Sequence, residues 1–151
     1  TGTTTRVQEE SLLLTKQHVW FNTTTGWAEA AIMIVNTGGR DVVIDKLSVR
    51  GQECLWSNIY YWRTDNITVS DDLGVTPTNM SGATYDILLQ GELRTFQQAN
   101  DDITLKSGWT IAIYIMHPDS VSLKDVGTTV GITSFTANAQ YYKETNVEAA
   151  Q

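Results

Sequence analysis

The most reactive side chains of this sequence are two histidines and one cysteine. His18 and His117 lie far apart, and neither accompanies a Gly-x-Ser-x-Gly motif or another pairing of nucleophile and base. Cys54 stands in the apolar context Cys54-Leu55-Trp56, which is typical of a packed thiol rather than a reactive one. We therefore expect hydrogen-bonding roles for both histidines. We expect no enzyme activity, no zinc site and no bound cofactor.

Several aspartates occur in predicted turns, where carboxylate oxygens suit Ca²⁺. They lack the spaced Asp-x-Asp-x-Asp-Gly pattern of a calcium-binding loop. Aspartate is also favoured in turns because its side chain accepts hydrogen bonds from nearby backbone N–H groups. We predict turn-forming roles rather than a metal site for Asp71, Asp72, Asp101, Asp102, Asp119 and Asp125.

Asn-x-Ser/Thr motifs are the clearest modification signal in the chain. They are Asn22-Thr23-Thr24, Asn66-Ile67-Thr68 and Asn79-Met80-Ser81. None has proline at the middle position, and all lie in or beside predicted loops, where an oligosaccharide transferase can reach them. Asn22, Asn66 and Asn79 are therefore candidate sites for N-linked glycans, and they favour an extracellular location.

The composition describes a folded chain whose surface is polar but poor in charge. Of its 151 residues, 41% are hydrophobic and 18% are charged, and much of the polarity comes from Thr, Asn and Gln. The net charge of -7 and the lack of any Lys/Arg cluster oppose binding to nucleic acid. No apolar run approaches the ~20 residues that span a bilayer, and the first residues lack a signal-peptide pattern. We expect a single domain over residues 1–151 that makes no membrane contact.

Alternating apolar and polar positions predict an all-β fold. Strands are expected over residues 12–21, 27–35, 43–50, 54–62, 85–90, 103–106, 109–116 and 127–142. The sequence Asn36-Thr37-Gly38-Gly39 predicts the turn of a central β-hairpin. In the last strand the apolar face changes side near Ser134, which predicts a β-bulge. About seven or eight strands and no long amphipathic helix indicate an immunoglobulin-like antiparallel β-sandwich.

The segments outside these strands carry weaker signals. Residues 1–5 are predicted to be a flexible lead. A short N-terminal helix through Ser11 is an alternative for the following residues, because Thr5 and Gln8 could form a capping box. Residues 63–84 are predicted to form a long surface loop that carries specific function. Residues 144–151 are predicted to form a polar, frayed tail.

Four segments together resemble the globular region of archaeal type IV pilins and archaellins, the subunits of archaeal surface filaments. They are SLLLTKQHVWF (11–21), VNTGGRDVVI (35–44), ITLKSGWTIAIYI (103–115) and DVGTTVGITSFTANAQYYKETNVEA (125–149). The resemblance implies a β-sandwich head packed around a filament, with copies of itself and N-linked glycans as partners, acting in adhesion or motility. Those subunits polymerise through an N-terminal hydrophobic helix of about 20 residues, which this sequence does not contain.

Three alternatives stay open beside a filament subunit. The first is an accessory archaellum protein that binds surface-layer protein, since such proteins have a similar sandwich. The second is a filament built by donation of an N-terminal strand, with Thr5 to Leu14 as the donor. The third is a carbohydrate-binding module in which Trp20, Trp56 and Trp62 form a stacking surface. Exposure of two of these rings side by side would favour binding, and burial of all three would favour a structural role.

Overall fold

The structure, a computed structural model, describes residues 9–150 and consists almost entirely of β-strands. The strands are β1 (Leu12–Asn22), β2 (Trp27–Asn36), β3 (Val42–Ile44), β4 (Lys46–Val49), β5 (Gln52–Glu53), β6 (Ile59–Thr64), β7 (Thr84–Leu89), β8 (Glu92–Gln98), β9 (Ile103–Leu105), β10 (Thr110–Met116), β11 (Thr129–Phe135) and β12 (Gln140–Ala150). Two short 3₁₀ helices are η1 (Trp56–Asn58) and η2 (Leu123–Asp125). The all-β prediction is confirmed.

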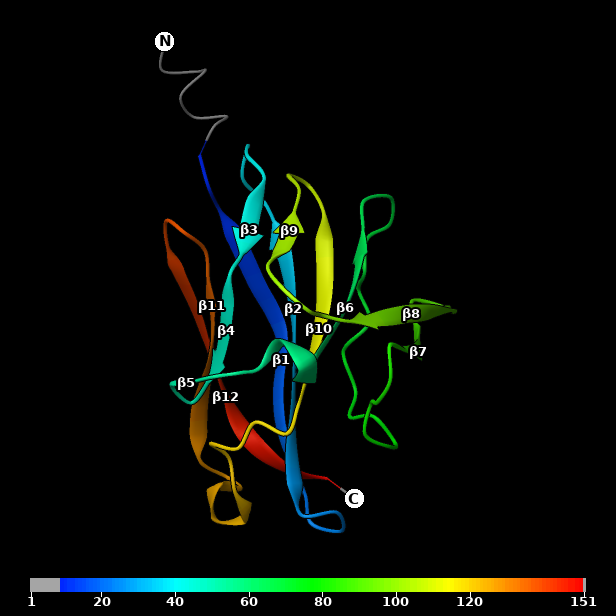
Figure 1. Cartoon of the computed structure of the whole chain (residues 1–151), viewed down its shortest axis with the longest axis vertical. Helices are drawn as coiled ribbons and strands as arrows, with labels where there is room; N and C mark the ends of the chain where they lie inside the picture. Colours follow the sequence, from blue (N-terminus) through cyan, green and yellow to red (C-terminus); the bar gives the residue numbers. More distant parts are fainter. Residues whose placement is uncertain (1–8, 151) are drawn as a thin grey trace.

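Ten of the strands form one sheet that curls over itself. Its order is β5-β4-β11-β12-β1-β2-β10-β6-β8-β7, and β3 pairs with β9 in a separate sheet of two strands. Figure 1 shows β4 and β11 facing β1, β2 and β10 as two layers. The strand pairs are antiparallel except β1 and β12, which run parallel from the pair Val19 and Val147 onward. The expected antiparallel arrangement is therefore incorrect at that one pair.

β2 lies near the middle of the large sheet, between β1 and β10. Its residues from Ala28 to Ile34 are buried, and alternate side chains enter cores on opposite faces of the sheet. Small Ala side chains and branched Ile side chains suit a strand that is covered on both faces. The prediction of a central strand over this segment is confirmed.

The main core lies between the two layers of the curled sheet. Ile32 and Ile34 of β2 and the isoleucines of β10 face side chains from β4, β11 and β12 across it. The small β3–β9 sheet adds Ile44 and Leu105 to the same cluster. This core therefore joins both layers and fixes how the sheet curls.

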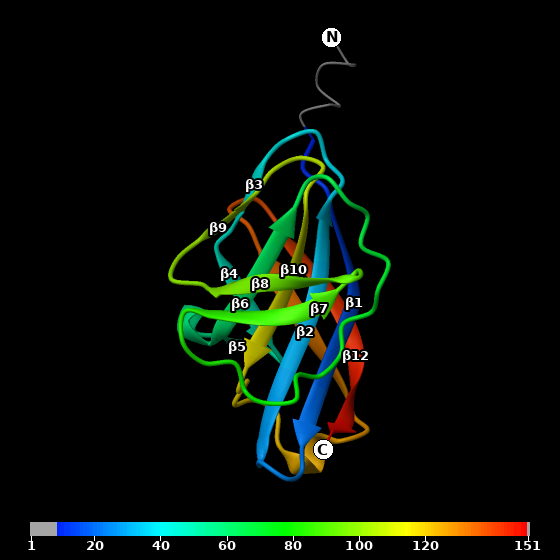
Figure 2. The ribbon, with the colours of Figure 1, turned by 90° about the vertical axis from the view of Figure 1, so that its right-hand side faces the viewer.

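A second core covers the opposite face of β2, β6 and β10. It contains Met33, Tyr60 and Tyr114 from the sheet and Phe96 from β8. The β7–β8 hairpin crosses this face at a steep angle in Figure 2. Residues 65–83, named the covering loop here, have no regular structure and add Val69, Leu73 and Met80 to this core. The predicted long loop is present, but some of its side chains are buried in this core.

The predicted hairpin at Asn36-Thr37-Gly38-Gly39 is wrong. β2 pairs with β1 and β10, whereas β3 pairs with β9 and β4 pairs with β11 and β5. The chain therefore crosses from one layer to the other after Asn36. The tight two-residue turns lie elsewhere, at Arg50-Gly51 between β4 and β5 and at Gln90-Gly91 between β7 and β8. All four of these turn residues have positive φ, as type I′ turns require.

The predicted single strand over residues 127–142 is also wrong. β11 ends at Phe135 and β12 begins at Gln140, and the two strands pair as a hairpin. The apolar face changes side near Ser134 because the chain turns back there, not because of a β-bulge. The predicted frayed tail from residue 144 is instead the second half of β12, where Val147 is buried and pairs with β1.

The start of the described chain is extended. Residues 9–11 adopt no helix, and β1 begins at Leu12 as predicted. The flexible lead over residues 1–5 and the capping residues Thr5 and Gln8 lie outside the described residues. Across residues 9–150, no helix is long and apolar enough to cross a membrane.

Candidate functional site

The loop that follows β2 forms an attachment site for the N-terminal segment. This anchor loop, residues 36–39, is organised by Asn36, whose side chain is buried. Its Nδ2 donates to the carbonyl oxygens of Arg40 at 3.0 Å and Leu105 at 2.9 Å, and its Oδ1 accepts from the N–H of Gly38 at 3.0 Å. Because a buried amide is costly unless its groups are paired, Asn36 fixes the anchor loop against the end of β9.

The anchor loop holds the chain just before β1 by backbone hydrogen bonds. The N–H groups of Thr37 and Gly38 donate to the carbonyl oxygen of Ser11, each at 3.0 Å. The N–H of Gly39 donates to the carbonyl oxygen of Glu9, also at 3.0 Å. The anchor loop thus binds the extended segment 9–11 through backbone hydrogen bonds. The sequence alone predicted a hairpin turn here and did not indicate this role.

Glu10 attaches the same segment to the opposite layer. Its carboxylate accepts hydrogen bonds from Thr136 Oγ1 at 2.8 Å, Tyr141 Oη at 2.9 Å and Asn138 Nδ2 at 3.4 Å. Partial burial raises the pKa of Glu10, but these hydrogen bonds outweigh it and hold the pKa below its ordinary value. Residues 9–11 are therefore held from both layers, at one end of the long axis (Figure 1).

The predicted glycan sites lie in three different settings. Asn66 is exposed in the covering loop, where its Oδ1 accepts a hydrogen bond from Thr64 at 3.0 Å. Asn22 ends β1, and its Oδ1 accepts from the N–H groups of Thr24 at 2.8 Å and Thr25 at 3.0 Å. Asn79 is partly buried and lines a small cavity together with Asn22. The structure thus brings Asn22 and Asn79 together and leaves Asn66 apart.

His18 connects three parts of the chain. Its Nε2 lies 2.8 Å from Asp72 of the covering loop, and its Nδ1 lies 3.1 Å from Glu148 of β12. Its ring stacks on the Trp20 ring, with 5.0 Å between the ring centres. Burial lowers the pKa of His18, but the hydrogen bonds and charges of the two carboxylates outweigh this and raise it. The predicted hydrogen-bonding role of His18 is confirmed, and both carboxylates are largely exposed.

Glu29 is a buried carboxylic acid that no motif in the sequence indicates. It lies in β2 at 7% exposure and accepts hydrogen bonds from the N–H of Thr76 at 3.0 Å and from Thr76 Oγ1 at 2.7 Å. Burial raises the pKa of Glu29 to about 7, although the hydrogen bonds from Thr76 lower it. Glu29 therefore attaches the covering loop to the sheet with a side chain that titrates near neutral pH.

His117 and Cys54 line one shallow cavity near the end of β10. The His117 ring packs edge to face against the Trp27 ring, with 4.2 Å between the ring centres. The backbone of His117 has a positive φ of 53°. Burial raises the pKa of the Cys54 thiol to about 11, so the thiol is protonated and weakly nucleophilic at neutral pH. These properties agree with the packed thiol predicted for Cys54.

The predicted backbone-holding role is confirmed for four of the six aspartates, since Asp71, Asp72, Asp101 and Asp125 each accept a hydrogen bond from a backbone N–H. Asp125 accepts from the N–H and Oγ of Ser122 in a capping box on η2 and forms an ion pair with Arg50 at 2.8 Å. Asp71 accepts from the N–H of Gln90 at 2.7 Å. Within residues 9–150, no group of three or more His, Cys, Asp or Glu side chains is placed to hold a metal ion.

The predicted stacking surface of Trp20, Trp56 and Trp62 does not form. Trp20 is buried in the second core, Trp56 packs against the main core, and Trp62 packs against the second core. Trp56 thus lies on the opposite face of the sheet from Trp20 and Trp62, and Trp20 is buried. Trp62 instead lines a hollow with Tyr61 and Trp109. That grouping was not visible in the sequence, because Trp109, the residue just before β10, is brought beside β6 only by the pairing of β10 with β6.

Comparison with known proteins adds no family assignment. No protein-family model matches the sequence, and no curated protein matches it either.

Proposed function

We propose that this chain is a structural subunit of an archaeal cell-surface filament, a type IV pilus or an archaellum. Other copies of the chain are its main partners, and its role is adhesion or motility outside the cell. The proposal rests on the resemblance of four segments to archaeal pilins and archaellins and on the all-β fold.

The observation that carries the proposal is the attachment of residues 9–11. Backbone bonds from the anchor loop hold Ser11 and Glu9, and side-chain bonds hold Glu10. A β-domain joined to a filament core by its N-terminal segment must keep a fixed orientation relative to that core. Attachment of this segment to both layers suits that requirement, because the domain cannot pivot about residues 9–11 without breaking these bonds.

The surface chemistry supports self-association. Thr, Asn and Gln supply much of the polarity, and their neutral groups can pair across a contact without burying an unpaired charge. The candidate glycan sites Asn22, Asn66 and Asn79 lie at strand ends and in the covering loop. Glycans at these positions suit a surface that faces the extracellular medium.

The proposal is tested on cells of the native source. Filaments removed by shearing should contain this chain as a main component in mass spectrometry, and immunogold labelling should follow the filament length. Deletion of its gene should remove those filaments. Labelling confined to the surface layer, with filaments intact after deletion, would instead support the accessory surface-layer-binding protein.

The donor-strand alternative is less well supported by the described residues. Leu12, Leu13 and Leu14 of the suggested donor segment already pair with β2 of their own chain. Exchange between copies would require these pairs to open. An engineered disulfide between β1 and β2 that leaves filament assembly intact would exclude strand exchange as the assembly mechanism.

A further inference from the structure

A hollow of about 250 Å³ opens where β8 turns away from β6. β8 pairs with β6 only at Tyr60 and Tyr61, so the second half of β6 has β10 on one side and no strand on the other among the described residues. Figure 2 shows β8 leaving β6 at a steep angle. The lining residues are Tyr61, Trp62, Arg63, Thr95, Gln97 and Trp109, and this site is named the aromatic hollow.

Two aromatic residues on one face of the sheet make the hollow suited to a flat ligand with C–H faces. Tyr61 and Trp109 both pack against the main core and are partly buried, so packing restricts their positions while part of each residue stays exposed. Trp62 packs against the second core on the opposite face. Aromatic faces carry partial negative charge and attract groups with partial positive charge, such as the C–H groups of a sugar ring. The hollow lies just below the roughly 300 Å³ of the smallest pockets for drug-sized ligands, which limits it to about one sugar residue.

Polar groups with spare hydrogen-bonding capacity also line the hollow. Gln97 donates through Nε2 to Tyr61 Oη, which leaves its Oε1 as an acceptor. Thr95 Oγ1 donates to Asp86 at 2.9 Å and keeps lone pairs that can accept. These acceptors suit the hydroxyl groups of a sugar.

Two cations lie at or beside the hollow, since Arg63 lines it and Lys106 lies near the lining residue Trp109. The guanidinium of Arg63 lies 5.2 Å from the Tyr61 ring centre, and Nη1 donates to the carbonyl oxygen of Thr104. This bond uses one of five guanidinium N–H donors. Lys106 Nζ lies 5.8 Å from the ring centre of Trp109. In a chain with a net charge of -7, two cations beside one hollow favour a negatively charged ligand there.

We propose that the aromatic hollow binds one hexuronate residue of an acidic polysaccharide. The sugar ring lies against Tyr61 and Trp109, its carboxylate pairs with Arg63, and its hydroxyl groups donate to Gln97 and Thr95. A carboxylate suits Arg63 because the planar guanidinium can bind it through two parallel hydrogen bonds. The proposal does not depend on filament assembly, since the hollow is complete within one chain.

The test uses trimers of galacturonate and of mannuronate, with their methyl esters as neutral counterparts of the same size. Binding to the full chain is followed by tryptophan fluorescence and by calorimetry. We expect binding of at least one acid trimer, with affinity that falls as salt increases. The esters should bind about tenfold more weakly or worse, since they lose the charge-assisted bond to Arg63. Failure of both acid trimers to bind overturns the proposal, and equal binding of acid and ester overturns the role of Arg63.

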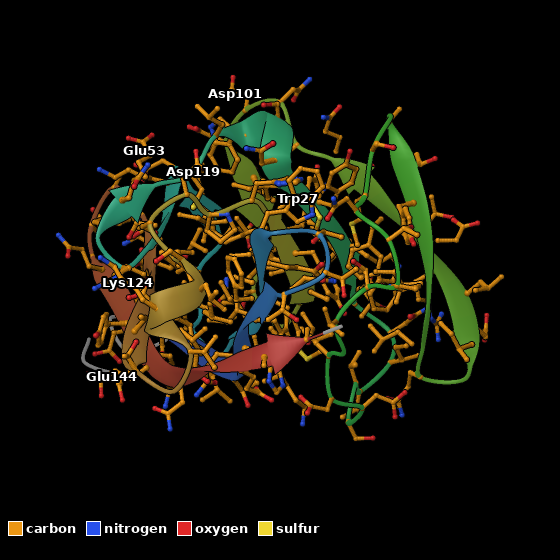
Figure 3. The ribbon with its side chains drawn as sticks, turned by 90° about the horizontal axis from the view of Figure 1, so that it is seen from below. Trp27, Glu53, Asp101, Asp119, Lys124 and Glu144 are labelled. Carbon is orange, nitrogen blue, oxygen red and sulfur yellow. The ribbon has the colours of Figure 1, made fainter. Side chains whose placement is uncertain are left out.

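Variants then locate the binding site. Arg63→Gln and Gln97→Ala should each weaken binding of the acid trimer about tenfold, and Arg63→Gln should also remove most of the preference over the ester. Lys124→Gln is the matched control, because it removes one exposed positive charge from η2. Figure 3 shows Lys124 on the opposite side of the molecule from the β7–β8 hairpin. An equal loss of affinity in Lys124→Gln would show that binding is a non-specific charge effect and would overturn the assignment to this hollow.

Discussion

Gly38 lies so close to Ser11 that a side chain has no room between them. A Cβ on Gly38 would lie 2.6 Å from the backbone nitrogen of Ser11 and 2.5 Å from the carbonyl oxygen of Glu9. Backbone atoms cannot yield as the end of a flexible side chain can. We therefore predict that Gly38→Ala lowers the free energy of unfolding by about 2 kcal/mol. In hydrogen exchange, the amides at the start of β1 should lose protection more than those of β10.

Gly74→Ala is the matched control for that prediction. Gly74 also lies in a loop, but a Cβ there would meet no atom within 4 Å, and its φ is outside the left-handed region. The free energy of unfolding of Gly74→Ala should stay the same or rise slightly, because alanine restricts the conformations of the unfolded chain. Equal destabilisation by both substitutions would contradict the close-contact explanation. If the filament proposal holds, Gly38→Ala should also impair assembly while Gly74→Ala does not.

The buried carboxyl of Glu29 should make stability depend on pH. Its folded-state pKa of about 7 lies above the ordinary 4.5, so the folded chain binds more protons than the unfolded chain between these values. The free energy of unfolding should therefore fall as pH rises from 4.5 to about 7 and level off above. The pKa shift of Glu29 corresponds to a change of roughly 3 kcal/mol in the free energy of unfolding, at about 1.4 kcal/mol per pKa unit. Urea unfolding at a series of pH values measures this change.

Glu29→Gln should remove this part of the pH dependence, because the amide does not titrate and can still accept from Thr76. Above pH 7 the variant should be more stable than the parent chain, since no carboxylate is buried. Glu53→Gln removes an exposed carboxyl instead and should leave the pH profile unchanged. A Glu29→Gln profile that keeps the full slope would show that Glu29 is not responsible.

His18 should add a second, electrostatic contribution in the same direction. Burial lowers its pKa, but Asp72 and Glu148 raise it above the ordinary 6.5. A raised histidine pKa stabilises the folded chain fully below the unfolded value, and this stability is lost as pH rises through the folded value. Asp72→Asn should lower the pKa of His18 measured by an NMR titration of its ring protons.

Asp65→Asn is the control for His18, because Asp65 is exposed in the same loop and His18 pairs with Asp72 instead. It should leave the His18 titration unchanged. Proteolysis of the covering loop gives an independent measurement. Cleavage in residues 65–83 should quicken as pH rises through neutrality, since Glu29 and His18 both attach this loop. A cleavage rate that falls with pH would contradict both assignments.

Strand positions were predictable because burial alone sets the pattern of alternation. β10 shows this best, since Ile111, Ile113 and Ile115 enter the main core while Ala112 and Tyr114 enter the second. The seven or eight strands expected became 12, because the segments 43–50 and 127–142 each contain parts of two strands and because β5 and β8 were not predicted. β5 has only two residues, too few for a periodic signal.

Pairing was less predictable, because turn residues do not reveal which strands become neighbours. Asn36 and Gly38 match a hairpin turn in composition, but their groups bind Leu105 and Ser11, which are distant in sequence. The candidate sites also differ in how far they could be predicted from the sequence. Local motifs such as the one at Asn66 are visible in one stretch of sequence. The contacts of Glu29 with Thr76 join residues 47 positions apart and leave no local pattern.

The structure also ranks the candidate glycan sites. Asn66 is exposed, whereas Asn79 is partly buried and Asn22 uses its side-chain oxygen to hold the N–H groups of Thr24 and Thr25. In protein from the native source, glycopeptide mass spectrometry should therefore find Asn66 occupied in the largest fraction of chains. Asn66→Gln should remove the main glycoform with a smaller loss of stability than Asn22→Gln, because it displaces the acceptor of one hydrogen bond, from Thr64, rather than of two. Asn22→Gln should lower the free energy of unfolding by about 1 kcal/mol even without glycans, because the turn after β1 loses its hydrogen bonds. Higher occupancy at Asn22 than at Asn66 would show that the accessibility of the folded domain does not govern modification.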